Sequence, residues 1–217
     1  SNDINDLKYT VNDVKRFYDV LIDPEFCKVS QDKVYLMING SQGDSLPTHT
    51  NVLFRLGNLG SRIKPEDTFI FYFSGHGMVR EGKQYLLCIN SDPRSLDTLE
   101  ASAVPLEKIQ SRLREINAHE IFIIVDACRN DPTSGKGDAD NELTDEFARG
   151  LRIKPKRQAD GMPGFTATLF ASSLGERAYE WSEKESGVFS FYLVEGIKGK
   201  AMDTGRKIKF AGWRTIL

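Results

Sequence analysis

Two apolar runs decide the fold: residues 68–73 (TFIFYF) and residues 121–125 (IFIIV). Both are continuous rather than alternating, which is typical of strands buried on both faces of a parallel sheet. Polar residues follow each run, SGHG at 74–77 and DACR at 126–129. Because ligands bind beyond the carboxyl ends of parallel strands, these two polar endings mark the expected site.

The rest of the chain alternates between helical and extended patterns. Amphipathic spacing predicts helices over residues 10–22, from Thr48 or Thr50 to about 59, over 105–116, over 142–149 and over 188–197. Shorter apolar runs predict strands at 34–38, 85–89 and 165–170. Strands that alternate with helices are joined by right-handed crossovers. We therefore predict an α/β fold, a three-layer sandwich with a mainly parallel central sheet flanked by helices.

Residues 130–164 are rich in glycine, proline and charge, which marks an exposed connection. We predict one domain built from a larger unit at 1–148, a basic flexible linker at 149–164 and a smaller unit at 165–217. No internal repeat is visible in the sequence.

Composition excludes several classes of protein. The 217 residues carry 29 basic and 31 acidic side chains, a formal charge of −2, which disfavours a nucleic-acid-binding protein. No apolar run is long enough to span a membrane, and no signal peptide is visible. Three cysteines, an odd number, do not form a disulfide framework and suit a reducing compartment. We therefore expect a cytoplasmic protein.

His76 and Cys128 are the candidate chemical pair, since each follows one of the two buried strands. A thiol becomes a nucleophile when a neighbouring base favours its thiolate. The glycines around His76 allow a ligand to approach the backbone closely. A cysteine after an apolar strand is also a common small core residue, and we interpret Cys27 and Cys88 in this way. We expect the remaining histidines, His49 and His119, to be solvated or capping.

The two polar endings carry a family resemblance. YFSGHG at 72–77 and IVDACR at 124–129 resemble the histidine and cysteine boxes of the caspase-like cysteine peptidases. Among these the chain most resembles the prokaryotic orthocaspases and the paracaspases, with the metacaspases next. Residues 7–14 resemble the family's first helix, and residues 170–190 its small-subunit strand, specificity loop and helix. The larger and smaller units would then correspond to the p20-like and p10-like subunits of one catalytic domain.

The resemblance implies an endopeptidase with a Cys–His dyad. Cys128 would attack the scissile carbonyl, His76 would protonate the leaving amine, and the N–H groups of Gly77 and Cys128 would form the oxyanion hole.

The resemblance also implies substrate-binding residues, namely Asp13, Asp126, Glu180 and Ser172. Relatives with the first two acids cut after Arg or Lys, because paired carboxylates favour a guanidinium or ammonium group. Alternative interpretations are that Asp126 caps local N–H groups, that Asp13 is a solvated helix residue, and that Glu176 replaces Glu180.

The basic linker holds the residue types that such an enzyme would cut after. We expect self-processing at one or more of Arg149, Arg152, Lys154, Lys156 and Arg157. The alternative is a plain solvated basic loop. The expected substrates are proteins or peptides with basic residues, and a monomer is favoured over a dimer.

The acid spacing does not predict a metal. Some metacaspases need calcium, but the candidate acids here lack the spacing of a known calcium loop, so we expect no cofactor. These acids are Asp92, Asp97, Glu100, Asp138 and Asp140. The family also opens with an apolar strand before its first helix, and no such strand precedes residue 7 here. The sheet would therefore lack a central member unless the sequence is a fragment of a longer protein or that segment is cleaved, and we expect a fragment.

Two other functions compete with the peptidase. One is an inactive caspase-like scaffold or signalling module that recruits partners, which the presence of both His76 and Cys128 disfavours. The other is a phosphate or nucleotide binder on a parallel sheet, which the absence of a glycine-rich phosphate motif disfavours.

Overall fold

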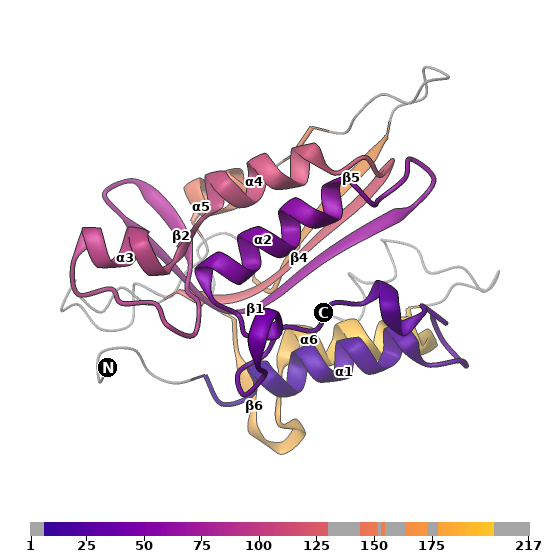
Figure 1. Ribbon diagram of the computed structural model, residues 1–217. Helices are drawn as coiled ribbons and strands as arrows, with labels where there is room; N and C mark the ends of the chain where they lie inside the picture. The colour runs from indigo at the N-terminus through magenta and orange to yellow at the C-terminus, as the bar shows by residue number, and fades with distance from the viewer. Residues whose placement is uncertain (1–6, 130–143, 152, 155–163, 173–177, 202–217) are drawn as a thin grey trace.

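The computed structural model describes residues 7–129, 144–151, 153–154, 164–172 and 178–201, and these form three layers (Figure 1). The middle layer is a five-stranded sheet in the order β3-β2-β1-β4-β5. Its strands are β1 (Thr68–Arg80), β2 (Lys83–Leu86), β3 (Val104–Pro105), β4 (Glu120–Arg129) and β5 (Phe165–Phe170). β1, β4 and β5 are parallel, whereas β2 is antiparallel to both its neighbours. The predicted α/β sandwich with a mainly parallel centre is confirmed.

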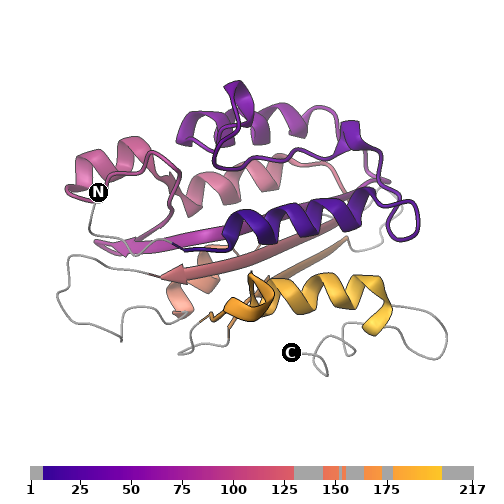
Figure 2. The same cartoon turned by 90° about the horizontal axis from the view of Figure 1, so that it is seen from below.

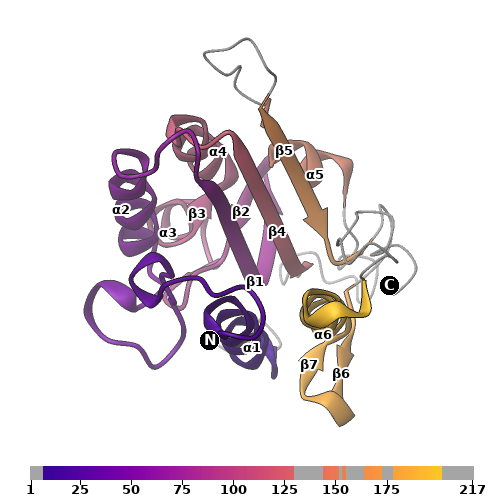
Figure 3. The ribbon, with the colours of Figure 1, turned by 90° about the vertical axis from the view of Figure 1, so that its right-hand side faces the viewer.

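Helices cover both faces of the sheet (Figures 2 and 3). α2 (His49–Gly60), α4 (Leu106–Glu115) and α5 (Asp145–Gly150) pack on one face, around a core that includes Leu113, Ile123 and Phe147. α1 (Thr10–Ile22) and α6 (Val188–Glu195) pack on the other, around Phe17, Ile124 and Phe189. The remaining helical segments are α3 (Leu96–Ser102), the short turns Gln31–Lys33, Gly43–Ser45 and Ser182–Lys184, and a π-helical turn at Gly196–Lys200. None of the helices that the structure describes has the length and apolar character to cross a bilayer.

A small hairpin, β6 (Glu180–Trp181) and β7 (Ser186–Gly187), leads directly into α6. Aromatic packing fixes it there: the Trp181 ring lies 5.5 Å from the Phe191 ring and 6.3 Å from the Tyr192 ring, centroid to centroid. Such ring pairs contribute beyond the area that they bury. The hairpin is therefore held against the outer side of α6, and its second strand is aimed at α1.

Local sequence signals account for most element boundaries. Thr48 is the N-cap of α2, where its hydroxyl accepts a hydrogen bond from Asn51 N–H at 3.3 Å. Pro105 immediately precedes α4, a position at which its missing N–H costs nothing. The predicted helices at 10–22 and 105–116 and the strand at 165–170 are confirmed to within two residues.

Three predicted strands differ from the structure, and one helix was not predicted. β1 extends beyond the predicted run at 68–73, because it continues through the glycines to Arg80 and pairs there with β2. β2 ends at Leu86, so the strand expected at 85–89 begins and ends earlier. α3 was not predicted, since its seven residues show no clear apolar stripe. Residues 34–38 form no strand, because a strand requires a hydrogen-bonded partner and this segment has none in the described structure.

One edge of β1 is unpaired over residues 68–75 within the described structure, since β4 lies on one side and β2 joins only at residue 77. A cavity of about 940 Å³ lies along this edge, between α1, α2 and residues 34–38. Ile70 of β1 is 38% exposed, unusual for the centre of a covered sheet.

The start of the predicted linker is packed rather than exposed. Arg149 belongs to α5, and the next apolar residues, Leu151 and Ile153, are buried in the core at 0% and 9% exposure. Apolar side chains at these two positions pack the chain against the helical layer. The basic composition of the segment did not indicate this packing. The rest of the linker, apart from residue 164, lies outside the described residues.

Candidate active site

β1 and β4 bring His76 and Cys128 to the same level of the sheet. The strands are parallel and in register, so that the Cα atoms of His76 and Cys128 are partners. The His76 side chain is half-buried, and its backbone carbonyl accepts a hydrogen bond from Leu87 N–H at 2.9 Å. The structure describes Cys128 by its backbone. The two positions thus lie on adjacent strands at the carboxyl-terminal end of the parallel pair.

The glycines on either side of His76 are positions of close packing. A Cβ at Gly75 would lie 2.8 Å from the Phe73 ring, and a Cβ at Gly77 would lie 2.9 Å from the Phe147 ring of α5. Both separations are shorter than a carbon–carbon contact allows, so any larger residue would displace a ring. The glycines therefore let the two rings pack directly on the strand that carries His76.

Asp13, in the first turn of α1, is buried at 3% exposure. Its carboxylate accepts hydrogen bonds from Ser186 Oγ at 2.5 Å and from Gly187 N–H at 3.0 Å, both in β7. This burial excludes the alternative that Asp13 is a solvated helix residue. The contact joins the start of the chain to the hairpin before α6.

Asp126 lies in β4, two residues before Cys128, and is buried at 7% exposure. Its Oδ2 accepts a hydrogen bond from Ser190 Oγ at 2.5 Å, and the same hydroxyl lies 2.6 Å from Tyr72 Oη of β1. The Ser190 N–H is a further donor. The partners of Asp126 therefore belong to the first turn of α6 and not to its own strand end, contrary to the alternative of a local cap.

The two carboxylates converge at Gly187. A Cβ built on Gly187 would lie 2.8 Å from Asp126 Oδ2 and 3.2 Å from Asp13 Oδ2. Across the hairpin Gly187 pairs with Glu180, whose exposed carboxylate accepts hydrogen bonds from the N–H groups of residues 8 and 9 at 2.8 and 3.2 Å. The three acids predicted from the sequence, Asp13, Asp126 and Glu180, thus lie around Gly187, where the absence of a side chain leaves room for them.

Burial raises the pKa of both inner carboxyl groups. The pKa of Asp126 rises from 3.8 to about 6, mainly through desolvation and further through Asp13 and Glu180, while the Ser190 hydrogen bonds oppose the rise. Desolvation also raises the pKa of Asp13, against the hydrogen bonds of Ser186 and Gly187. A site whose acids resist ionisation favours a bound cation, because the cation relieves the cost of their charge.

The other predicted residues lie apart from the two carboxylates. Ser172 is half-buried and follows β5, where Ala171 N–H bonds to the Val125 carbonyl at 3.0 Å. Arg149 is exposed in α5 and forms an ion pair with Asp145 at 2.5 Å, and Lys154 is exposed. The positions outside the described residues are Arg152, Lys156, Arg157 and Glu176.

Sequence reasoning missed four residues of this site: Tyr72, Ser186, Gly187 and Ser190. Ser190 had a readable signal, since it is a small polar residue within the apolar run VFSFYLV at 188–194. A buried hydroxyl in such a helix needs a hydrogen-bond partner. Ser186 and Gly187 have no comparable signal, because their contact with Asp13 spans more than 170 residues of chain.

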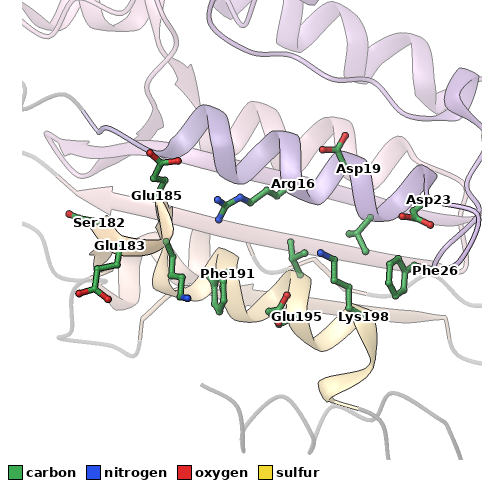
Figure 4. Close-up of a pocket in the computed structure, with 13 residues that line it drawn as sticks. Arg16, Asp19, Asp23, Phe26, Ser182, Glu183, Glu185, Phe191, Glu195 and Lys198 are labelled. Atoms are coloured by element: carbon green, nitrogen blue, oxygen red, sulfur yellow. The ribbon is translucent and has the colours of Figure 1, made fainter.

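A second cavity, of about 520 Å³, lies between α1 and α6 behind the hairpin (Figure 4). Arg16 and Asp19 line it from α1, Asp23 lines it from just beyond the end of that helix, and Glu195 and Lys198 line it from the other side. Its lining mixes charges of both signs and includes neither histidine nor cysteine. It therefore offers no thiol nucleophile and no imidazole base for peptide hydrolysis.

Metal-ligating side chains do not gather within the described part of the chain, where no group of three or more His, Cys, Asp or Glu could hold an ion. Of the scattered acids considered for calcium, Asp92 pairs with Arg94 at 2.6 Å and Glu100 with Lys83 at 2.7 Å. These two carboxylates already have cationic partners.

Comparison with known proteins identifies the family of the chain. The family model of the caspase domain matches residues 2–209. A probable protease from a Desulfuromonadales bacterium is 30% identical over 140 residues, which is 61% of this chain and 15% of that much longer protein. The family match covers both strands of the candidate pair, the two buried acids and the hairpin between them. The chain therefore belongs to the caspase domain family of peptidases.

Proposed function

We propose that the chain is a cysteine endopeptidase that cuts peptide bonds after Arg or Lys. The observation that carries this proposal is the convergence of Asp13 and Asp126 at Gly187. Asp126 lies in β4 two residues before Cys128, which pairs with His76 across the sheet. A peptidase family supplies the reaction class, and the buried acids supply the preference for a basic side chain.

In this mechanism the Cys128 thiolate attacks the scissile carbonyl carbon and forms a tetrahedral oxyanion. N–H groups at Gly77 and Cys128 stabilise that oxyanion, and His76 donates a proton to the departing amine. Water then attacks the thioester carbonyl, His76 accepts a proton from it, and the acid product leaves with the thiol restored.

The preference for Arg or Lys follows from charge. Asp13 and Asp126 form one buried acidic pair, to which Glu180 adds negative potential from the hairpin. A guanidinium or ammonium group entering between the carboxylates would form charge-assisted hydrogen bonds with both. An aspartate side chain would meet like charge there, which costs several kcal/mol.

Self-processing is part of the proposal. The basic residues after α5 are the type that this pocket would accept, and Lys154 among them is exposed. Cys27 is exposed, contrary to its prediction as a core residue, and Cys88 is half-buried. Both are free thiols, which is compatible with the reducing cytoplasm in which we propose that the enzyme acts on protein substrates.

Fluorogenic peptides ending in Arg, Lys or Asp test the proposal, each assayed with and without calcium. We expect turnover of the Arg and Lys peptides only, and loss of that turnover in Cys128→Ala and His76→Ala. Turnover of the Asp peptide would refute the pocket assignment. No turnover of any peptide by folded protein would favour an inactive scaffold that recruits partners.

A further inference from the structure

The Ser190 hydroxyl connects the two central strands to the acidic pocket. It is 2% exposed and lies 2.5 Å from Asp126 Oδ2 in β4 and 2.6 Å from Tyr72 Oη in β1. α6, which carries Ser190, is otherwise apolar on this side and packs on Phe17 and Ile124. A buried hydroxyl in apolar surroundings is unfavourable unless its donor and acceptor are both used, as they are here.

Proton counting fixes the direction of these bonds while Asp126 is ionised. A carboxylate only accepts, so the single Ser190 proton points to Asp126. The Ser190 oxygen must then accept the proton of Tyr72, since a hydroxyl has one proton and two lone pairs. Three groups on β1, α6 and β4 thus form a relay in which Tyr72 donates to Ser190 and Ser190 donates to Asp126. If Asp126 is neutral, its own proton can reverse the second bond.

The groups that face Asp126 from the surrounding elements are mostly acidic. Asp13 faces it from α1, Glu180 acts on it from β6, and Tyr72 adds a buried phenol from β1. Among the residues that the structure describes, Arg16 of α1 is a cation that acts on Asp13. Against desolvation and two neighbouring acids, the hydrogen bonds from Ser190 are the main influence that favours a charged Asp126.

We propose that Ser190 is a positioning residue for substrate selection: through the Tyr72–Ser190–Asp126 relay it keeps Asp126 charged and turned toward Gly187, and so sets the pH at which the pocket accepts a basic side chain. This inference rests on the proposed preference for Arg and Lys. Ser190 touches neither the scissile bond nor, in this arrangement, the entering cation, and it acts through Asp126.

The relay predicts a direction for the pH dependence. The pKa of Asp126 is about 6, so below that pH the carboxyl becomes neutral and attracts a guanidinium less. Loss of the Ser190 hydroxyl removes a donor to the charged form and raises this midpoint further. A hydrogen bond to a charged group corresponds to a shift of about one pH unit.

The experiment measures kcat/KM for an Arg peptide relative to a peptide with an uncharged residue at the same position, from about pH 5 to 8, a range that brackets the Asp126 titration. The ratio cancels the titration of His76 and Cys128, which both peptides share. We expect Ser190→Ala to move the midpoint of the ratio upward by about one unit, Ser190→Thr to restore it, and Tyr72→Phe to move it less in the same direction. Superimposable profiles for Ser190→Ala and the native enzyme would overturn the inference.

A second measurement separates this inference from the proposed function. Carbon-detected NMR follows the titration of the Asp126 carboxyl in protein carrying Cys128→Ala, which needs no turnover. An upward shift of the Asp126 midpoint in Ser190→Ala, or in Tyr72→Phe if Ser190→Ala does not fold, supports the relay even if no peptide is cut. An unchanged midpoint refutes it even if Arg peptides are cut.

Discussion

The Cα atoms of His76 and Cys128 face each other across the parallel strands β1 and β4, two positions beyond the pair Ser74–Asp126. Strand pairing therefore places the proposed base, the proposed nucleophile and one acid of the proposed pocket along about 7 Å of sheet. The second acid, Asp13, reaches the same place from α1. Chemistry and selection would thus depend on one strand register.

Removal of the imidazole should stop catalysis without removing the thiol. We expect His76→Ala to lower kcat for an Arg peptide by about 10²–10⁴-fold, the usual contribution of a general acid–base residue. End-point assays after incubation for several hours would detect this residual rate. His119→Ala, a histidine before β4, is the matched control and should retain full activity. Native kcat in His76→Ala would remove this histidine from the mechanism.

The Gly187 position should control access to the pocket. In Gly187→Ala the new Cβ would lie 2.8 Å from Asp126 Oδ2, in the space that a basic side chain needs. We expect kcat/KM for the Arg peptide to fall by at least about 100-fold, comparable to losing a charged hydrogen bond, while iodoacetamide labelling of Cys128 continues.

Gly57→Ala is the control for Gly187→Ala. Its Cβ would meet the Arg112 side chain at an ordinary 3.8 Å, far from the pocket, so activity should be unchanged. Retained Arg turnover in Gly187→Ala would show that the substrate does not enter between the two acids.

Asp126 should reduce stability at neutral pH. Its folded pKa of about 6 lies above the ordinary 3.8, so the folded state favours the neutral carboxyl. The free energy of unfolding therefore falls as pH rises from about 4 through 6. Urea unfolding at the two ends of this range should show Asp126→Asn more stable than the native chain at the upper end, on the order of 2–3 kcal/mol. The same variant should lose Arg turnover.

The exposed Asp19 of α1 provides the comparison for Asp126→Asn. Asp19→Asn should change the free energy of unfolding by less than about 0.5 kcal/mol at either pH. If Asp126→Asn destabilises the protein at neutral pH, the carboxylate is a structural cap and not a strained binding group.

Self-processing should occur after one of the basic residues beyond α5, such as the exposed Lys154, and not after Arg149. Proteases bind their substrates in extended form, whereas Arg149 lies within the helix α5. Its neighbour Ala148 is buried, and its own side chain forms an ion pair with Asp145. Mass spectrometry of the purified protein would locate the cut, and Cys128→Ala should remain one chain. A first fragment ending at Arg149 would contradict the packed α5 described above.

The parts of the fold that could be predicted are those fixed by local pattern. The apolar run at 68–73 predicts a strand, and the apolar stripe of α1 predicts a helix, each from a few neighbouring residues. Residues 34–38 have an equally apolar pattern but form no strand, because pairing depends on a neighbour elsewhere in the chain. β1 was longer than predicted for the same reason: glycines that weaken an isolated strand are tolerated where β2 and β4 pair on either side.

The candidate site divides in a similar way. Asp13 and Asp126 were predicted from their place in two motifs, and the structure brings them together. The groups that hold them were not predicted, because Ser186 and Gly187 come from a hairpin distant in sequence. Ser190 was overlooked within an apolar helix, although a lone buried hydroxyl there is itself an indication of a polar partner.

The ten consecutive pairs that join β1 to β4, from Thr68–Glu120 to Gly77–Arg129, have one last consequence. The central ladder of the molecule, and not its loops, holds the two positions that we propose to react. On heating, a site held by the central strands cannot unfold before the rest of the domain. Loss of activity and global unfolding should therefore occur at the same temperature.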